Sequence, residues 1–250
     1  NKGKLLISGC LIRGKFVDFF LTGKGRVGTA LISYFKSKNI ALNDLDESDP
    51  DVTGILFAAL PDDHLLNYIN KIRNKNNHLH IVHFSGSLTA NIERCYLFHP
   101  YASINKDTDI SDILFTLWGK KNPTLEAALS KTGLKFIYAG TRPTPFYHIS
   151  AVLSGNFTQF FFVAALELLK QQGFSHNDSI ILIKQLIASS IENCVVSATS
   201  GITGPAARGD RNTVDAETAV IAGKDEKLAE AFSLINNLIF KAVRNGAVFK

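Results

Sequence analysis

The sequence predicts an α/β protein in which a mostly parallel sheet precedes an all-helical domain. Over about the first 140 residues, short apolar runs of strand length alternate with segments of helical spacing, which is typical of a parallel sheet with helices on both faces. After Gly140 every apolar pattern has helical spacing. We therefore expect a sheet domain at residues 1–142 and a helical domain at residues 143–250, with the linker at residues 140–146.

The composition is that of a soluble globular protein with a sizeable core. Hydrophobic residues make up 46% of the 250 residues and charged residues 20%, and the formal net charge is +5. Lys and Arg are scattered without a run, so phosphorylated or carboxylate ligands explain this charge as well as nucleic acid does. We expect no nucleic-acid partner.

Cysteine usage and hydropathy point to a cytoplasmic protein. Cys10, Cys95 and Cys194 have neither CxxC nor metal-ligand spacing, so we expect no disulfide framework and no metal. The apolar run at residues 5–10 is too short for the core of a signal peptide. Because no segment has 18 or more consecutive apolar residues, we expect no membrane partner.

The stretch at residues 17–28 organises the first domain. An apolar strand stops at Gly23, and an amphipathic segment begins at Gly28, with Gly25 between them. This is the spacing of the Rossmann-type dinucleotide fingerprint: the first glycine makes the turn, the second admits the pyrophosphate, and the third lets helix pack on strand. The N–H groups of the helix N-terminus would then face phosphate.

The segment after this turn bears on the choice between NAD and NADP. Residues 29–38 are expected to form a helix and residues 39–43 a second strand that ends before Asp44. A carboxylate at that place would bind the ribose hydroxyls of NAD, whereas Arg26 in the glycine loop offers a cation for the 2′-phosphate of NADP. The alternative for residues 44–48 is a solvated loop.

A second strand–helix unit follows. The apolar run at residues 53–60 reads as a strand buried on both faces, and residues 65–72 supply its crossover helix. Pro61 lies between them, and the carboxylates of Asp62 and Asp63 are expected to cap the helix.

The next strand, at residues 78–84, ends in Ser85 and Gly86, which would face the ligand crevice because they follow the carboxyl end of a parallel strand. His83 lies inside this strand pattern and is expected to be a packed histidine. Further strands are expected at residues 95–98, 110–118 and 134–139, and helices at residues 147–171, 178–200 and 224–245.

The first helix after the linker could carry chemistry. At about 100° per residue, His148 and Gly155 lie about 20° apart around the axis, and Asn156 about 80° from His148, so they can share one wall of a cleft. Histidine can deliver a proton near neutral pH, and asparagine offers both a donor and an acceptor. The alternative is a locally satisfied histidine and an asparagine bonded between helices.

The stretch at residues 199–214 contains glycines and a proline that cannot continue a helix. Arg208 could bind a carboxylate in a bidentate pair, and Asp210 could hold Arg208 or cap the following segment. Thr213 is a candidate N-cap. The alternative is an ordinary loop between helices.

The order GKGRVG, ILFAALPDDHL, HIVHFSG, FHPYAS, YHISAVLSGNF and ITGPAARGDRNTV resembles a family of bacterial Rossmann-like oxidoreductases with a helical C-terminal domain. This family belongs to the 6-phosphogluconate dehydrogenase-like superfamily and is similar to pyrroline-5-carboxylate reductases and ketopantoate reductases. Some members look like the alternative ketopantoate reductase of pantothenate synthesis. The resemblance covers residues 17–245.

The resemblance implies a set of site residues. It places cofactor at Gly23, Gly25, Arg26, Val27, Gly28, Asp44, Pro61, Asp62, Ser85 and Gly86, and substrate at Ser85, His99, Ser154 and Asp210. The Lys that related enzymes carry on the first C-terminal helix is absent, and His148 takes its place.

The implied reaction is hydride transfer from NADPH, with NADH as the alternative, to the carbonyl carbon of a small 2-keto acid, with ketopantoate the expected substrate. His148 would protonate the alkoxide, Asn156 would hydrogen-bond it, and Arg208 would bind the carboxylate. Two alternatives are a pyrroline-5-carboxylate reductase-like imine reductase and a non-catalytic nucleotide-sensing module. The phenylalanine-rich helix at residues 157–162 and the resemblance together predict a homodimer.

Overall fold

The computed structural model describes residues 10–12, 15–88 and 91–249. The chain divides into two compact units, Asn1–Thr158 and Gln159–Lys250. The change from strands to helices falls within the expected linker, between β8 (Lys135–Gly140) and α4 (Pro145–Ala151). The first helical residues nevertheless belong to the same compact unit as the sheet, and the two units are described separately.

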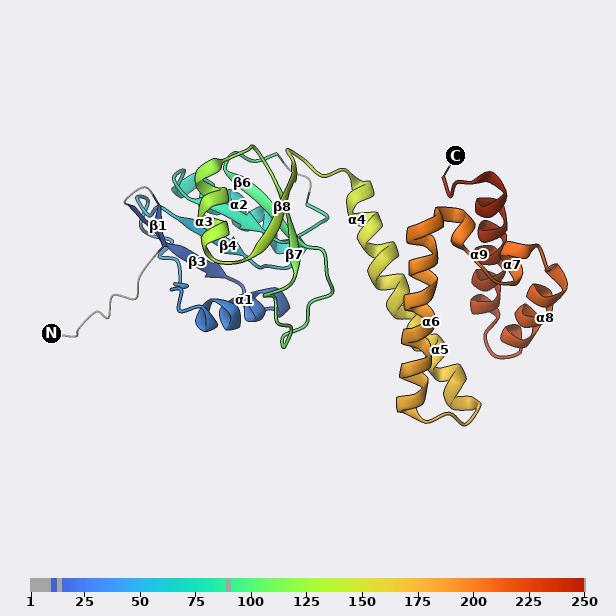
Figure 1. Ribbon diagram of the computed structural model, residues 1–250. Helices are drawn as coiled ribbons and strands as arrows, with labels where there is room; N and C mark the ends of the chain where they lie inside the picture. Colours follow the sequence, from blue (N-terminus) through green and yellow to red (C-terminus); the bar gives the residue numbers. More distant parts are fainter. Residues whose placement is uncertain (1–9, 13–14, 89–90, 250) are drawn as a thin grey trace. The chain divides into compact units, whose positions relative to one another are not determined.

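The first unit is built on a six-stranded sheet in the order β3-β4-β5-β6-β7-β8 (Figure 1). Strands β3 to β6 are parallel, β7 is antiparallel to β6, and β8 is parallel to β7. A separate hairpin pairs β1 (Cys10–Ile12) with β2 (Lys15–Val17). The predicted fold class is confirmed. The remaining strands are β3 (Phe19–Thr22), β4 (Ile55–Ala58), β5 (His80–His83), β6 (Cys95–Pro100) and β7 (Leu114–Trp118).

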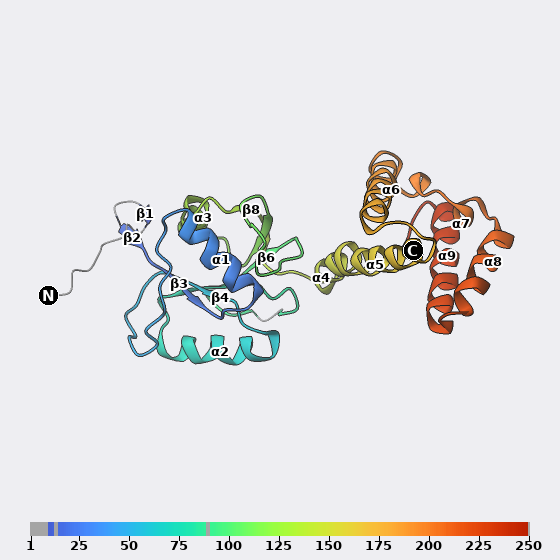
Figure 2. The ribbon, with the colours of Figure 1, turned by 90° about the horizontal axis from the view of Figure 1, so that it is seen from below.

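Helices cover both faces of this sheet, as Figure 2 shows: α1 (Arg26–Ser37) and α3 (Pro123–Lys131) lie on one face and α2 (Asp62–Lys75) on the other. The first face holds an aromatic core, in which the Phe98 and Phe115 rings stack with centroids 4.5 Å apart. Burial of such rings is the main apolar contribution to this side of the sheet. The fully buried phenylalanines are Phe19, Phe35, Phe57, Phe98 and Phe115.

The expected strand at residues 39–43 does not form. Only Asn43 pairs there, in a single parallel bridge with Phe20 of β3. Asn43 N–H donates to Phe19 O at 2.9 Å, and Leu21 N–H donates to Asn43 O at 3.0 Å. Asn39 leaves α1 with a φ of 53°, so the chain is still turning where the strand was expected to begin. The segment lies at the edge of the sheet without forming a ladder.

The second unit is helical. Its elements are α6 (His176–Ser197), the 3₁₀ turn η2 (Ala198–Gly201), α7 (Pro205–Arg208), α8 (Arg211–Ala222) and α9 (Glu226–Asn245), while α5 (Thr158–Gln171) begins at the last residue of the first unit. Helices α5, α6 and α9 confirm the predicted ones. Helix α8 was missed, because Asp210 starts a helix inside what reads as a loop: its side chain accepts from Thr213 N–H at 3.2 Å.

Two helical stretches, Pro145–Gln171 and His176–Arg208, are long and apolar enough to cross a membrane by length and composition alone. Their best 18-residue windows have mean hydropathies of 1.5 and 1.4. Polar residues interrupt both stretches, which is why consecutive apolar residues gave no such signal.

The turn between β3 and α1 depends on two glycines. Gly23 has a φ of 89°, in the left-handed region, and a Cβ there would lie 2.2 Å from Ala59 O. A Cβ on Gly28 would lie 2.1 Å from Gly23 O. A Cβ on Gly25 would meet no atom within 4 Å. The first and third glycines therefore allow close backbone packing, whereas the second faces open space.

We expect Gly28→Ala to lower the free energy of unfolding by about 1–3 kcal/mol or more, because a backbone oxygen cannot swing away from the new methyl group. The matched variant Gly25→Ala, at the N-cap of α1, should cost less than about 1 kcal/mol. Urea unfolding followed by circular dichroism measures both. Equal losses in the two variants would show that close packing at Gly28 is not the constraint.

Candidate active site

The carboxyl ends of four parallel strands meet at one edge of the sheet in the first unit. Gly23 follows β3, Pro61 follows β4, Ser85 follows β5, and His99 lies near the end of β6. In open α/β sheets, ligands bind outside this edge, at the loops that follow the strands. Five of the site residues expected from the sequence, Gly23, Gly25, Pro61, Ser85 and Gly86, lie on these loops, and Arg26, Val27, Gly28 and Asp62 lie in the first turns of the helices that follow.

The glycine turn presents an uncapped helix N-terminus. Gly25 is the N-cap of α1, and no side chain of the described residues caps that end. The first turn of α1 contains no acidic residue, so nothing there competes with an anion for the helix N–H groups. Arg26 is exposed, while Val27 packs on the core. Together with the open space at Gly25, these features fit a phosphate group.

A groove of about 490 Å³ lies beside this turn. Its polar lining includes Lys24, Lys36, Asn43 and Asp44. Asp44 therefore lies where the sequence suggested, but Arg26 is not among the residues that line the groove. Two lysines that the sequence did not single out provide the cations instead.

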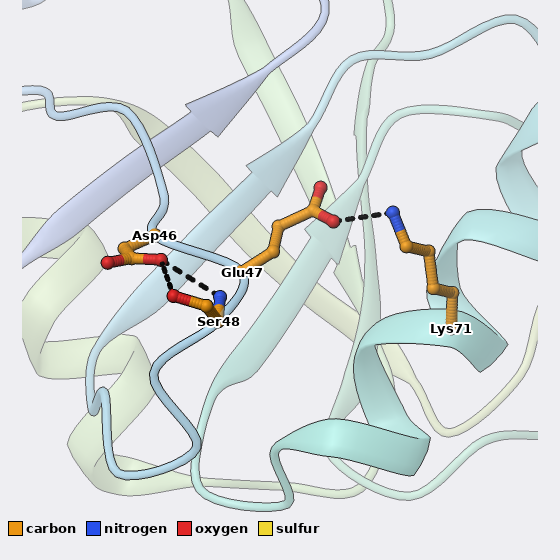
Figure 3. Close-up of polar contacts among 4 residues, drawn as sticks. All are labelled: Asp46, Glu47, Ser48 and Lys71. Carbon is orange, nitrogen blue, oxygen red and sulfur yellow. Dashed lines mark hydrogen bonds and ion pairs between the residues drawn. The ribbon is translucent and has the colours of Figure 1, made fainter.

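The loop that follows Asp44 is anchored by local contacts (Figure 3). Lys71 of α2 forms an ion pair with Glu47 at 2.6 Å, and Asp46 accepts from Ser48 N–H at 2.9 Å. The hydrogen bond from Lys71 lowers the pKa of Glu47, and the hydrogen bonds from Ser48 lower the pKa of Asp46. Asp46 and Glu47 thus anchor the loop, and Asp44 is the acid of this loop that lines the groove.

The carboxylates after β4 do not cap α2 as expected. Pro61 occupies the N-cap position, and Asp62 and Asp63 lie in the first turn, where they interact favourably with the helix dipole. Asp62 also accepts a short hydrogen bond from the Ser87 hydroxyl, which lies 3.0 Å from the Ser85 hydroxyl. This chain of contacts joins the loops after β4 and β5.

Two histidines converge on Gly86. A Cβ at this position would lie 2.7 Å from His148 Nδ1 and 3.1 Å from His99 Nε2, so a side chain would displace one of the rings. The two imidazole rings have centroids 6.4 Å apart. His148 Nδ1 is buried and has no hydrogen-bond partner among the residues that the structure describes. An unsatisfied buried nitrogen is costly, and native structures pair almost all such atoms with protein, water or a ligand.

Tyr147 connects His99 to the antiparallel strand β7. Its hydroxyl lies 2.9 Å from His99 Nδ1 and 2.6 Å from Thr116 Oγ1, and Trp118 Nε1 donates to Thr116 Oγ1 at 3.1 Å. The Tyr147 and Trp118 rings pack with centroids 5.1 Å apart. This network holds the start of α4 against the sheet and fixes the orientation of His99.

Burial decides the charge state of these groups. It lowers the pKa of His99 to about 4, with a further contribution from His148, so His99 is neutral at pH 7. Burial also raises the pKa of Tyr147, which keeps its proton. Neither group is a ready source of a proton at neutral pH.

The other residues expected on the first helix lie on a π-helical segment, Val152–Phe157. The angles derived for an α-helix do not apply there, because a π-turn contains more residues. Ser154 donates to Ser150 O at 2.8 Å, Asn156 is exposed, and a Cβ on Gly155 would meet nothing. Their roles toward a substrate stay predictions, as does that of Ser85.

Arg208 and Asp210 lie in the second unit. Asp210 caps α8, accepts from Thr213 N–H and Oγ1, and has its pKa lowered mainly by these hydrogen bonds. The capping alternative for Asp210 is therefore confirmed, and Thr213 is its partner and not the cap. Arg208 ends α7 and forms no ion pair among the described residues. Substrate binding by either residue stays a prediction.

His83 confirms the expectation of a packed histidine. It is 4% exposed, and burial lowers its pKa to about 4. In an unfolded chain a histidine titrates near pH 6.5, so between about pH 6.5 and 4 the unfolded state binds more protons than the folded state. The stability that neutral His83 and His99 contribute is complete above pH 6.5 and is lost as the pH falls toward 4.

We therefore expect the urea concentration at the unfolding midpoint to decrease when the pH is lowered from 7 to 4.5. His83 should account for a loss of roughly 3 kcal/mol at most in the free energy of unfolding. His83→Leu, which removes the buried imidazole, should make stability less dependent on pH over this range. His64→Gln, at an exposed position, should leave the dependence unchanged. An unaltered slope in His83→Leu would contradict this account.

Comparisons with known proteins agree with this fold. A search of curated proteins found no match. Among solved structures, a Bacteroides fragilis protein described as a candidate NADP oxidoreductase matches at 19% identity, with a TM-score of 0.71 over 90% of this chain and 98% of that one. Plasmodium falciparum pyrroline carboxylate reductase with NADP bound matches at 13% identity and a TM-score of 0.57, over 90% and 98%.

An imine reductase from Myxococcus stipitatus in complex with NADP⁺ matches at 13% identity and a TM-score of 0.67, over 92% of this chain and 95% of that one. At such identities these likenesses establish the shared fold. The family model of the domain of unknown function DUF2520 matches residues 115–239, half of the chain. The protein thus belongs to the DUF2520 family.

Proposed function

We propose that the protein is an NADP-dependent reductase that adds a hydride and a proton across a C=O or C=N bond of a small substrate. The observation that carries the proposal is the convergence of His148 and His99 on Gly86, at the strand ends that also carry the glycine turn. The names of the three solved relatives, all NADP enzymes or candidates, support the same reaction class.

The residues of the first unit fit a dinucleotide. The open space at Gly25 and the uncapped N-terminus of α1 would hold the pyrophosphate, and the groove at Lys24 and Lys36 would take the adenosine part. Two lysines against one carboxylate, Asp44, favour the 2′-phosphate of NADP over NAD. When bound, the reduced nicotinamide supplies the hydride.

His148 is the proposed acid. Histidine exchanges protons in the neutral range, and this side chain has a nitrogen that no protein group satisfies. His99 is held neutral and Tyr147 keeps its proton, so they orient the cluster rather than supply the proton. The proton goes to the oxygen or nitrogen of the reduced bond, and His148 regains one from solvent.

Two substrate classes remain in the proposal. The sequence resemblance favours a 2-keto acid such as ketopantoate, whereas the solved relatives named pyrroline carboxylate reductase and imine reductase favour a cyclic or open imine. Both need the same hydride and proton. The site geometry does not depend on which of them is correct.

The test is oxidation of NADPH, and of NADH in parallel, with ketopantoate, pyrroline-5-carboxylate and a panel of other 2-keto acids and imines. NADPH should bind more tightly than NADH. His148→Ala should lower kcat about 10²–10⁴-fold, the usual contribution of a general acid. Tyr147→Phe should cost about tenfold, through the orientation of His99. His64→Ala is the exposed control.

Turnover of His148→Ala at the wild-type rate would rule out this histidine as the acid. Tight NADPH binding without turnover of any substrate would instead favour the nucleotide-sensing module.

We also propose that the chain forms a homodimer through the apolar residues of α5 and α6. Leu186, Val195 and Val196 of α6 are 69%, 72% and 77% exposed, and Phe160 of α5 is 56% exposed. Large apolar side chains that are this exposed on two successive helices favour an interface with another protein surface. Lys184 and Glu192 interrupt α6, and a lysine at the centre of a membrane span costs about 2.5–3.5 kcal/mol, so we favour a second copy.

Sedimentation without detergent should give twice the 27.4 kDa mass of the 250-residue chain. Leu186→Glu with Val196→Glu should produce a folded monomer, while Lys241→Glu, on α9, serves as the charge control. A monomeric wild type, or one that is recovered with lipid vesicles, would refute the dimer.

A further inference from the structure

The first unit contains a second cavity, of about 500 Å³, that the proposed reaction does not use. It is formed by the loop and strand start at residues 91–97, the turn at residues 118–122 after β7, and residues 141–143 after β8. Such a volume lies in the range of sites for small ligands. None of its lining residues belongs to the glycine turn or to the His99–Tyr147–His148 cluster.

The lining of this cavity, which we call the basic cavity, is strongly cationic. Arg94, Lys120, Lys121 and Arg142 line it, against the single carboxylate of Glu93. No ion pair within residues 10–12, 15–88 and 91–249 involves any of these five side chains. Arg94 donates to a backbone carbonyl, and the Lys121 ammonium lies 5.7 Å from the Tyr138 ring centroid, so neither charge is neutralised.

A buried polar group lines the same cavity. His83 is 4% exposed, and its Nδ1 has no hydrogen-bond partner in the described part of the chain. Native structures satisfy almost all such atoms, with protein, water or ligand. The unpartnered imidazole and the unpaired cations are independent observations, and both belong to the lining of the basic cavity.

We propose that the basic cavity binds a small anion that carries phosphate groups. Arginine and lysine together are the usual ligands of phosphate, and an unpaired excess of positive charge favours an ion with more than one negative charge. These charged residues line one cavity, which favours a small molecule over nucleic acid. This proposal does not rest on the reductase activity.

Trp118 provides a direct readout. It lines the basic cavity, and it is the single tryptophan of the sequence. Its indole N–H also donates to Thr116, which contacts Tyr147, so the cavity and the candidate active site share one residue. An anion beside the indole should change its fluorescence.

The experiment is a titration of the full chain with inorganic pyrophosphate at fixed ionic strength, followed by tryptophan fluorescence, without substrate. We expect a saturable change. The double variant Lys120→Gln with Lys121→Gln, and separately Arg142→Gln, should weaken binding about tenfold or more, as loss of charged hydrogen bonds does. Lys75→Gln, an exposed charge on α2 outside the cavity, should leave the affinity unchanged.

Two further arms separate the sources of any signal. Lys24→Gln should weaken pyrophosphate binding only if pyrophosphate occupies the glycine turn. Weaker binding in Lys24→Gln together with unchanged binding in the Lys120 and Lys121 variant would overturn the proposal. So would the absence of a saturable change, or a response to a DNA duplex that exceeds the response to pyrophosphate at equal phosphate concentration. Because NADPH oxidation is not measured, failure here leaves the reductase proposal untouched, and the reverse also holds.

Discussion

Close approach of backbone to backbone at the first turn is the constraint on which the first unit depends. The carbonyl oxygen of Gly23 occupies the space that a side chain of Gly28 would need, and Ala59 O occupies the space that a side chain of Gly23 would need. Helix α1 can therefore begin directly beside β3 and β4. This contact directs the uncapped end of α1 toward the edge where the strands end, and it opens the space at Gly25.

The same device recurs at Gly86. There the missing side chain admits two imidazole rings, one from β6 and one from α4, instead of a backbone oxygen. Gly25, in the turn after β3, leaves space that fits a phosphate, and Gly86, in the loop after β5, lets two imidazole rings approach each other. Both follow a buried strand, so the sheet fixes their positions before any ligand binds.

The sequence predicted what is local and periodic. The glycine spacing, the buried strand at residues 53–60 and the histidine after the linker all depend on neighbouring residues, and the structure contains each of them. The network of Tyr147 with Thr116 and His99 joins residues 31 and 48 positions apart, so no spacing rule could indicate it. The only signal was a tyrosine beside the candidate acid. The π-helical segment and α8 were missed because neither depends on apolar periodicity. The first is set by the pattern of its backbone hydrogen bonds, and the second begins where Asp210 accepts from a backbone N–H group.

The surroundings of His99 keep it neutral at pH 7. Its ring centroid lies 6.4 Å from that of His148, so a charge on one ring opposes a charge on the other. His99 is the more constrained, because Tyr147 binds its Nδ1 and burial holds its pKa near 4. His148 has a buried Nδ1 that no described residue satisfies, and in the proposed reaction the substrate would be its partner.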